Sequence, residues 1–280
     1  MMTMHALNRL IDLALEEDIG TGDITTETLI PTDAEGDAAL IAKEDLVLAG
    51  IPVAQAVFKR LDPTITFPEQ LADGTSVTPG TCILKVQGRL QSLLTGERTA
   101  LNFLQRLSGI ATHVRRYLEA MPATAIRLVD TRKTTPGWRA LEKYAVRTGG
   151  AANHRMSLSD GILIKDNHVA ICGGIRAALE KARRTAPHTL KLEIEVDTPA
   201  EAQEAAEAGA DIIMLDNMAP ETIREAVRRI DGRALVEVSG GVNRNNIAAL
   251  AASGVDIVSV GALTHSAVAV DISMTILNAS

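Results

Sequence analysis

The sequence predicts an α/β protein whose second part is built from repeated β/α units. After residue 122, short apolar runs alternate with Ala-rich segments of helical character. The motif AGADII at 208–213 recurs as SGVDIV at 253–258, as expected where similar units follow one another. Right-handed β/α crossovers build a parallel sheet, and such units in series often close. We therefore expect a barrel, with an open doubly wound sheet as the alternative.

The composition limits the classes of function. With 280 residues, the chain can form one large domain or two smaller ones, and 46% hydrophobic residues is ordinary for a globular protein. Aromatic residues make up 2%, so the core must be aliphatic, and surfaces that stack on nucleic-acid bases are not expected. The net charge of −7 also argues against nucleic acid as a partner, because a phosphate-backbone binder should be basic.

The sequence contains no targeting or membrane-spanning pattern. No stretch reaches the roughly 18 consecutive apolar residues of a membrane span. The N-terminal segment lacks a basic flank followed by an apolar run, and its acidic residues argue against a transit peptide. Cys82 and Cys172 form neither a disulfide framework nor a metal-ligand spacing. We therefore expect a cytoplasmic protein without a membrane partner.

Before residue 100, helices and strands are mixed in an order typical of an α+β domain with an antiparallel sheet. Leu7, Leu10, Ile11 and Ala14 share one face of an amphipathic helix at the N-terminus. Residues 22–36 have the Gly, Pro and polar composition of a loop. The remaining predicted elements are two short strands in 38–50, a helix at 52–61, strands at 64–67 and 81–88, and one long helix or a broken pair over 94–121.

After Pro122, strands and helices alternate. The apolar runs predict six strands, and the segments between them predict helices, several with N-terminal signals such as Thr198 before Pro199. The strands are expected at 126–129, 162–164, 190–196, 212–215, 235–238 and 257–260, and the helices in PGWRALEKYAVRT, GIRAALEKARR, PAEAQEAAEAG, PETIREAVRRI and NRNNIAALAASG.

Each predicted strand of this second part ends in polar, charged or glycine residues. A single polar exit is usually an ordinary loop, but the carboxyl ends of the strands of a barrel surround one cavity. Six such exits together therefore predict a reactive face. The exits begin at Asp130, Lys165, Glu195, Asp216, Ser239 and Gly261.

The first two exits are strongly basic. Between Arg132 and His168 there are seven lysines and arginines against three acids, and His154 and His168 add further donors. A solvated helix face would explain some of these cations, but not Arg132, Lys133 and Lys165, which follow apolar strands. A cation at a buried mouth needs an anion, and arginine can bind both oxygens of a carboxylate or phosphate. The sequence therefore predicts a ligand with several negative charges.

The later exits are acidic or glycine-rich. Residues 190–196 alternate, so that some glutamates should point into a barrel, and Asp216 ends the next strand. Such carboxylates can hold sugar hydroxyls or Mg²⁺, and a salt bridge to Lys165 or Arg132 is the alternative. Glycines in 239–241 let backbone N–H groups approach a phosphate at the following helix. Together, the exits indicate a phosphorylated sugar that meets a polycarboxylate.

At these residues the sequence resembles the quinolinate phosphoribosyltransferase family, also called nicotinate-nucleotide pyrophosphorylase (carboxylating). The resemblance runs across most of 97–266, and the block 130–168 is highly specific. The matching segments are ERTALNFLQRLSGIAT, DTRKTTPGWRALEKYAVRTGGAANHRMSLSDGILIKDNH, EIEVDT, MLDN, VSGG and VGALTHS.

The resemblance implies a fold similar to that of type II phosphoribosyltransferases. An N-terminal α/β sandwich domain would be followed by an incomplete α/β barrel of about six strands. The sandwich would comprise residues 1–105, joined by the C-terminal tail 268–280, and the barrel would comprise 106–267.

The resemblance also implies a reaction in which quinolinate and phosphoribosyl pyrophosphate, with Mg²⁺, give nicotinate mononucleotide, pyrophosphate and CO₂. Lys133, Lys165, Glu195 and Asp216 would be catalytic, and the last two would hold ribose hydroxyls or Mg²⁺. Arg98 would reach into the site of a partner subunit, which makes a homodimer the expected active unit. The substrate-binding residues would be Arg98, Thr131, Arg132, Lys133, His154, Arg155, Lys165, His168, Glu195, Asp216, Ser239, Gly240, Gly241 and Gly261.

Two alternatives stay open on the sequence. ModD-type paralogues associated with molybdenum transport share the fold and much of the basic block, and would act on another acceptor. In that group the KDNH-like stretch is altered, whereas Lys165 and His168 are both present here. A non-catalytic metabolite-binding protein would keep the pocket without the chemistry, and the complete set of cations argues against such a decayed site.

Overall fold

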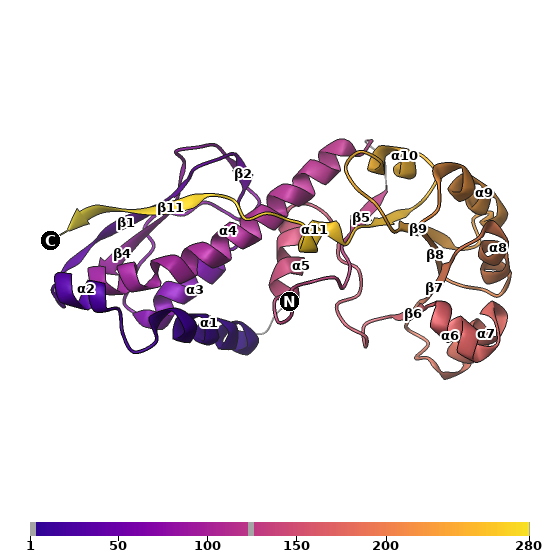
Figure 1. The fold of residues 1–280 in the computed structure, drawn as a ribbon, viewed down its shortest axis with the longest axis horizontal. Coiled ribbons are helices and arrows are strands. Elements are labelled where there is room, and N and C mark those ends of the chain that lie inside the picture. Colours follow the sequence, from indigo (N-terminus) through magenta and orange to yellow (C-terminus); the bar gives the residue numbers. More distant parts are fainter. Residues whose placement is uncertain (1–3, 123–125, 280) are drawn as a thin grey trace. The chain divides into compact units, whose positions relative to one another are not determined.

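The computed structural model describes residues 4–122 and 126–279, and Figure 1 shows the course of the chain. The chain divides into two compact units. Unit 1 comprises Met1–Arg115, Thr135–Gly150 and Ala267–Ser280, and unit 2 comprises Arg116–Thr134 and Ala151–Ser266. The chain therefore leaves unit 2 after Thr134, contributes a segment to unit 1 and returns at Ala151. The domain boundaries drawn from the sequence stay a prediction.

Unit 1 contains an antiparallel sheet in which the last strand of the chain lies beside the first (Figure 1). β1 (Glu35–Ala42) is the central strand, between β4 (Cys82–Arg89) and β11 (Ile272–Ala279). A second, smaller sheet pairs β2 (Leu46–Val47) with β3 (Ser76–Val77). The antiparallel sheet expected for the first part of the chain is therefore confirmed.

The structure of unit 1 corrects two sequence expectations and decides between two alternatives for a third. Residues 22–36 include a helix, because the Asp23 side chain accepts the N–H of Thr26 at 3.0 Å and caps it. The strand expected at 64–67 is only an isolated bridge between Thr66 and Gln87. The long helix is continuous, so the broken pair is wrong. The helices that begin in unit 1 are α1 (Met4–Ile19), α2 (Ile24–Leu29), α3 (Ile51–Leu61), α4 (Leu90–Ala120) and α5 (Arg139–Thr148).

Contacts with α4 fix the segment 135–150 in unit 1. The ring of Trp138 stacks on Phe103 of α4 with centroids 4.8 Å apart. The fully buried Glu142 accepts hydrogen bonds from Arg106 Nη2 at 2.8 Å and from Thr135 Oγ1 at 2.9 Å. A buried carboxylate is stable only with such partners. Nothing in the sequence of the segment indicated that it would leave the β/α series to pack here.

Unit 2 is built on six parallel strands in the order β5-β10-β9-β8-β7-β6. The strands follow chain order, with the last returning to the first, as they do around a barrel. Among the described residues no ladder joins β5 to β6, so the barrel is incomplete. A doubly wound sheet would instead reverse its order at an inner strand, so that alternative is wrong. The strands are β5 (Arg127–Val129), β6 (Ile162–Ile164), β7 (Leu192–Val196), β8 (Ile212–Asp216), β9 (Leu235–Ser239) and β10 (Ile257–Ser259).

The helices of unit 2 confirm the predicted alternation and add two short elements. Thr198 caps α8: its Oγ1 accepts the N–H of Glu201 at 3.2 Å, and its own N–H donates to the Glu201 carboxylate at 3.0 Å. Neither α6 nor α11, which both follow strand exits, was expected. The helices are α6 (Asp166–Cys172), α7 (Ile175–Thr185), α8 (Pro199–Glu207), α9 (Pro220–Ile230), α10 (Ile247–Ala251) and α11 (Ala262–His265).

The core of unit 2 is aliphatic, as the composition required. Ile194, Ile213, Leu215, Val238 and Val258 of the sheet are each at most 1% exposed. Strands covered on both faces read as continuous apolar runs, and each such side chain stabilises the fold by about 1.5–3 kcal/mol when buried. In the part of the chain that the structure describes, no helix has the length and apolar character needed to cross a membrane.

Gly109 of α4 closely faces the C-terminal segment of unit 1, so we expect Gly109→Ala to destabilise the protein. A Cβ atom there would overlap the carbonyl oxygen of Val268 and lie 3.0 Å from the Cα of Ala269. Such overpacking costs about 1–3 kcal/mol, and backbone atoms cannot rotate away as side chains can. Alanine gains only about 1 kcal/mol over glycine in a helix. A lower unfolding temperature in calorimetry is the expected result.

Gly96→Ala in the same helix is the matched control. Its Cβ would meet side-chain atoms of Leu61 and Phe58 at 3.0–3.3 Å, and these can shift. We expect a smaller change in unfolding temperature than for Gly109→Ala. Equal losses for the two variants would contradict the role assigned to the close approach at Val268.

Candidate active site

The predicted strand exits meet at one cavity within unit 2. The cavity has a volume of about 810 Å³, and residues at the carboxyl ends of all six parallel strands line it. The chemistry predicted separately for each exit is therefore gathered in one place. The predicted site residues that line the cavity are Thr131, Arg132, Lys133, His154, Arg155, Lys165, Glu195, Asp216, Ser239, Gly240, Gly241 and Gly261.

Two residues predicted for the site do not line this cavity. Arg98 belongs to the part of α4 that lies in unit 1. His168 lies on α6, where its Nδ1 accepts the backbone N–H of Lys165 at 3.0 Å and so caps the helix. The substrate-binding roles of both residues stay predictions.

Sequence reasoning assigned no role to several other residues of the cavity wall. Asn217 has a left-handed φ of 51°, and its side chain occupies the space beside Gly240 where a Cβ would be. His265 enters the wall from α11. A signal was present for both, since they lie in the segments MLDN and VGALTHS, but nothing indicated what they contact. The remaining wall residues are Leu163, Met214, Val242, Ser259, Val260 and Ala262.

Two arginines, Arg132 and Arg155, form the basic side of the cavity. The buried Nε of Arg132 has no hydrogen-bond partner among the described residues. Arg155 donates from Nη1 to the carbonyl oxygen of Gly161 at 2.9 Å. Burial and the nearby charge of Arg132 lower the pKa of Arg155, and Glu193 opposes this shift. An anion between the two guanidinium groups would favour their charged forms.

The acidic side of the cavity comes from neighbouring strands. Glu195 of β7 forms an ion pair with Lys165, which is the salt bridge that the sequence left open as an alternative. Asp216 ends β8 and accepts a hydrogen bond from Asn217 Nδ2 at 2.6 Å. Two carboxylates on one wall are hard oxygen donors of the kind that Mg²⁺ prefers. The donor set therefore fits the metal, and Mg²⁺ at Glu195 and Asp216 stays a prediction.

The glycine-rich wall is shaped by close approaches. Gly240 has a φ of 83° and Gly241 a φ of 61°, and a Cβ on Gly240 would overlap the side chain of Asn217. A Cβ on Gly261 would lie 2.8 Å from Lys133 Cδ. Side chains at positions 240 and 261 would therefore displace Asn217 or Lys133, and the phosphate contact of this wall stays a prediction. The helix expected right after 239–241 begins only at Ile247, so these glycines lie in a loop.

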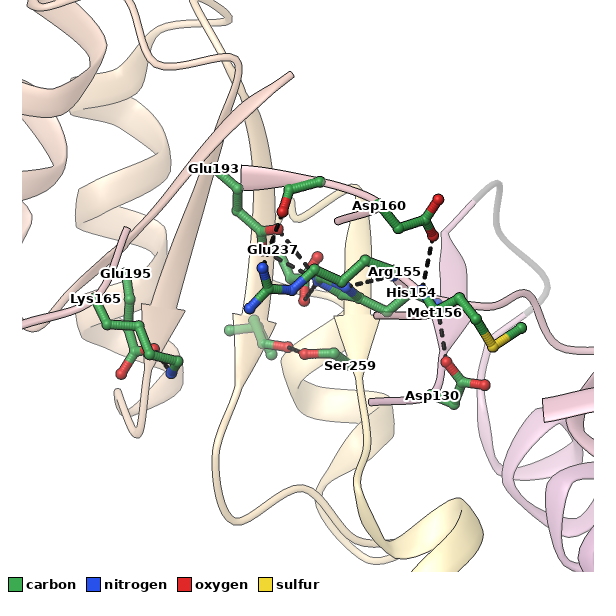
Figure 2. A network of polar contacts seen from close by, with 12 residues as sticks. Asp130, His154, Arg155, Met156, Asp160, Lys165, Glu193, Glu195, Glu237 and Ser259 are labelled. Carbon is green, nitrogen blue, oxygen red and sulfur yellow. Dashed lines mark hydrogen bonds and ion pairs between the residues drawn. The ribbon is translucent and has the colours of Figure 1, made fainter. Parts of the chain in front are cut away.

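A cluster of three titratable residues lies behind the basic side, inside the barrel (Figure 2). Glu193 and Glu237 are 5% and 1% exposed. His154 Nε2 lies 3.2 Å from Glu193 Oε2 and 3.6 Å from Glu237 Oε1. Sequence reasoning missed Glu237, although a charged residue within the apolar run LVEV was the signal that could have found it. Burial, and next the charge of Glu193, raise the pKa of Glu237 to about 7, while His154 and Ser259 oppose the shift.

Two family models match the chain, and both describe one family. The description "Quinolinate phosphoribosyl transferase, C-terminal domain" matches residues 110–275, and "Quinolinate phosphoribosyl transferase, N-terminal domain" matches residues 23–108. Together, the two matches cover most of the chain.

Relatives and solved structures match over almost the whole chain. A probable nicotinate-nucleotide pyrophosphorylase (carboxylating) of Bacillus subtilis is 42% identical over 96% of this chain and 93% of its own. Quinolinate phosphoribosyltransferase (decarboxylating) 1b of Nicotiana tabacum is 40% identical, covering 97% and 83%. The crystal structure of NadC from Streptococcus pyogenes superposes with a TM-score of 0.95 at 44% identity, covering 99% of each chain.

Glu237 is expected to make the stability of the protein depend on pH. Its folded pKa of about 7 lies above the ordinary value of 4.5, so between these values the folded protein holds a proton that the unfolded chain has released. This contribution to stability is complete below the lower value and is lost as the pH rises through the upper one. Glu237→Gln stays neutral, so its unfolding temperature should fall less than that of the wild type between about pH 5 and pH 8. Parallel profiles of unfolding temperature against pH would contradict this expectation.

Proposed function

The chain belongs to the quinolinate phosphoribosyltransferase family, and from this membership we propose its reaction and the residues that perform it. The protein transfers phosphoribosyl from phosphoribosyl pyrophosphate to quinolinate with decarboxylation, giving nicotinate mononucleotide, CO₂ and pyrophosphate for NAD biosynthesis. The observation that carries the proposal is the single cavity in which a basic wall, an acidic wall and a glycine wall meet. Those three walls match the dicarboxylate, the ribose and the phosphates of the two substrates.

The basic wall would bind quinolinate. Arg132 and Arg155 bring two guanidinium groups to one side of the cavity, and each can bind both oxygens of a carboxylate. The unpartnered Nε of Arg132 supports this assignment, because a buried donor without an acceptor is costly unless a ligand supplies one. Lys133 would add charge beside them, and Thr131, whose Oγ1 accepts the Lys133 N–H at 3.0 Å, would hold the turn.

The acidic and glycine walls would bind the phosphoribosyl donor. Glu195 and Asp216 would hold the ribose hydroxyls directly or through Mg²⁺, which would offset the negative charge of the pyrophosphate. The loop of Ser239, Gly240 and Gly241, with Gly261 beside it, would receive the 5′-phosphate. Lys165, paired with Glu195, would lie where the basic and acidic walls meet.

The site would act by position and charge. The bond from the ribose carbon to pyrophosphate breaks as the quinolinate nitrogen forms a new bond to that carbon, through an oxocarbenium-like state that the carboxylates stabilise. The carbon–carbon bond to the neighbouring carboxylate then breaks, CO₂ leaves, and the electron pair stays on the ring carbon until a proton replaces it. The adjacent pyridinium nitrogen stabilises that electron pair, so the step needs no further organic cofactor.

We also propose that the active unit is a homodimer in which Arg98 completes the site of the partner subunit. Arg98 lies on α4 in unit 1, and a contribution in trans would account for its place in the matching segment ERTALN. A cytoplasmic location would suit the two free cysteines, Cys82 and Cys172, because that compartment keeps thiols reduced.

A product assay tests the reaction. Purified protein with quinolinate, phosphoribosyl pyrophosphate and Mg²⁺ is expected to release nicotinate mononucleotide and CO₂ in equal amounts, while nicotinate in place of quinolinate gives no nucleotide. Chelation of Mg²⁺ should stop the reaction. Folded protein that forms no product from quinolinate would contradict the proposal. It would favour a ModD-type paralogue with another acceptor, or a metabolite-binding protein if quinolinate still raises the unfolding temperature.

Mixed dimers test the contribution of Arg98 in trans. Arg98→Ala and Arg132→Ala are each expected to lose most activity while they stay folded. Co-refolding equal amounts should restore about a quarter of wild-type activity, because half of the dimers are mixed and each mixed dimer has one intact site. The matched control mixes Arg132→Ala with Lys165→Ala. Both substitutions lie in unit 2, so each site of a mixed dimer carries one defect and no activity should be recovered. No recovery in the first mixture, or equal recovery in both, would contradict the arrangement.

A further inference from the structure

The barrel interior holds a second cavity that shares its wall with the active site. This cavity of about 380 Å³ is lined by residues at the amino ends of the strands, such as Arg127, Ile212 and Ile257. His154 and Arg155 line both cavities. His154 and Arg155 therefore lie between the two cavities and form part of the wall of the active-site cavity. The contacts that hold these two residues in place help to shape that wall.

Polar groups of this segment are fixed by buried or local acceptors. Asp130 is fully buried and accepts the backbone N–H of His154 at 2.9 Å and the side-chain amide of Asn153 at 2.6 Å. Asp160 accepts the N–H of Met156 at 2.7 Å. These bonds hold the segment but leave the direction of the His154 ring to other contacts (Figure 2). The Arg155 side chain is held in part by its hydrogen bond from Nη1 to the carbonyl oxygen of Gly161 at 2.9 Å.

The hydrogen bonds of His154 define which ring nitrogen carries the proton. Nδ1 accepts the N–H of Arg155 at 2.7 Å, so in the neutral ring the proton is on Nε2. Nε2 lies 3.3 Å from Glu193 Oε1 and 3.6 Å from Glu237 Oε1, within the barrel. Both ring nitrogens are thus directed at the protein. The three side chains could also surround a metal ion, but a neutral ring bound to metal through Nε2 would need a proton on the Nδ1 that accepts here.

We propose that Glu193 and Glu237 are positioning residues for quinolinate recognition. They orient the His154 ring and, through the hydrogen bond from the Arg155 N–H to Nδ1, the backbone from which the Arg155 side chain extends into the active-site cavity. In this arrangement His154 shapes the site without donating a ring hydrogen bond to the substrate. The inference rests on the proposed function, since it concerns how the same cavity recognises its acid substrate. It assigns a role to two carboxylates that do not line the active-site cavity themselves.

Electrostatics supports the same assignment. Burial and the charge of Arg132 both disfavour the charged form of Arg155, and Glu193 favours it. Glu193 therefore offsets part of the repulsion between the two guanidinium groups before the dicarboxylate arrives. Loss of this carboxylate should weaken binding of the acid more than binding of the phosphoribosyl donor, whose proposed contacts lie on the other walls.

Steady-state kinetics on Glu193 variants tests the proposal. Glu193→Ala removes the acceptor of a partly buried hydrogen bond from His154. KM for quinolinate should therefore rise roughly 10-fold or more, while KM for phosphoribosyl pyrophosphate should stay within about twofold. Glu193→Gln should recover part of the loss, because its amide oxygen still accepts from His154 Nε2. Glu237→Ala and Glu237→Gln should follow the same order with smaller effects, because the Glu237 oxygen lies farther from the ring.

Asp256→Asn is the matched control. Asp256 is exposed and accepts the N–H of Val236, the residue before Glu237, at 2.8 Å. It lines neither of the two cavities. It should leave both KM values unchanged. Equal increases in both KM values for Glu193→Ala, or no change in either, would overturn the proposal.

A measurement without turnover separates this proposal from the reaction itself. Ring ¹⁵N chemical shifts of His154 should report a proton on Nε2 in the wild type and a changed ring environment in Glu193→Ala, and calorimetry should find weaker quinolinate binding in that variant. If the wild type binds quinolinate but forms no nucleotide, the proposed reaction fails and the positioning role is still tested by binding. A proton on Nδ1, or unchanged quinolinate binding in Glu193→Ala, would overturn the positioning role.

Discussion

The parallel alignment of β5 to β10 is the constraint on which the active site depends. Asp216 lies beside Ser239 and Glu195 beside Met214, so the strands end at the same rim. A slip of one residue in any strand would turn its polar exit to the other face of the sheet. The buried aliphatic residues on both faces prevent that slip, because it would expose them or bury charge in their place. Glu193 and Glu195 of β7 are two residues apart, so their side chains share one face of the strand. Glu195 lies nearer the carboxyl end and lines the active-site cavity, whereas Glu193 lines the second cavity behind it.

The incomplete closure of the barrel accounts for the distribution of charge. β5 and β6 are the two edge strands of the six, and the cation Lys165 follows β6 directly, while Arg132 lies three residues after the end of β5. Ala152 forms a parallel bridge to Val129 of β5, so the segment that carries His154 and Arg155 continues beside this edge. The carboxylates and glycines come instead from the continuous side of the sheet. The charges are therefore separated by strand order, and the ion pair of Lys165 with Glu195 marks the point where the edge strand β6 meets β7.

The sequence predicted the elements and site residues that periodicity or the end of a strand determines. It did not predict those that depend on packing between segments far apart in the chain. The six strands and most of their helices followed from alternating apolar runs, and twelve predicted residues line one cavity because parallel strands must end together. His168 could not be placed, because its ring nitrogen caps a helix that lies beyond the exit, and no periodic signal marked that helix. Glu237 stood out as a charged residue in an apolar strand, but its neighbours His154 and Glu193 come from other parts of the chain, so its role could not be predicted from the strand alone.

The basic block that reads as one motif in the sequence is two structural parts. Arg139, Lys143 and Arg147 lie in the segment that joins unit 1, whereas Arg132 precedes this segment and Arg155 follows it, both in unit 2. The segment is held in unit 1 by the buried carboxylate of Glu142 and by the stacked ring of Trp138. The residues before and after the segment 135–150 both line the active-site cavity. The spacing of the Arg132 and Arg155 guanidinium groups is therefore restrained by the chain that connects them as well as by local contacts. The buried Asp130, two residues before Arg132, accepts the backbone N–H of His154, which precedes Arg155. This hydrogen bond connects the two ends of the segment. The relative placement of Arg132 and Arg155 therefore depends on a hydrogen bond between the two ends of a segment whose middle folds with the other unit.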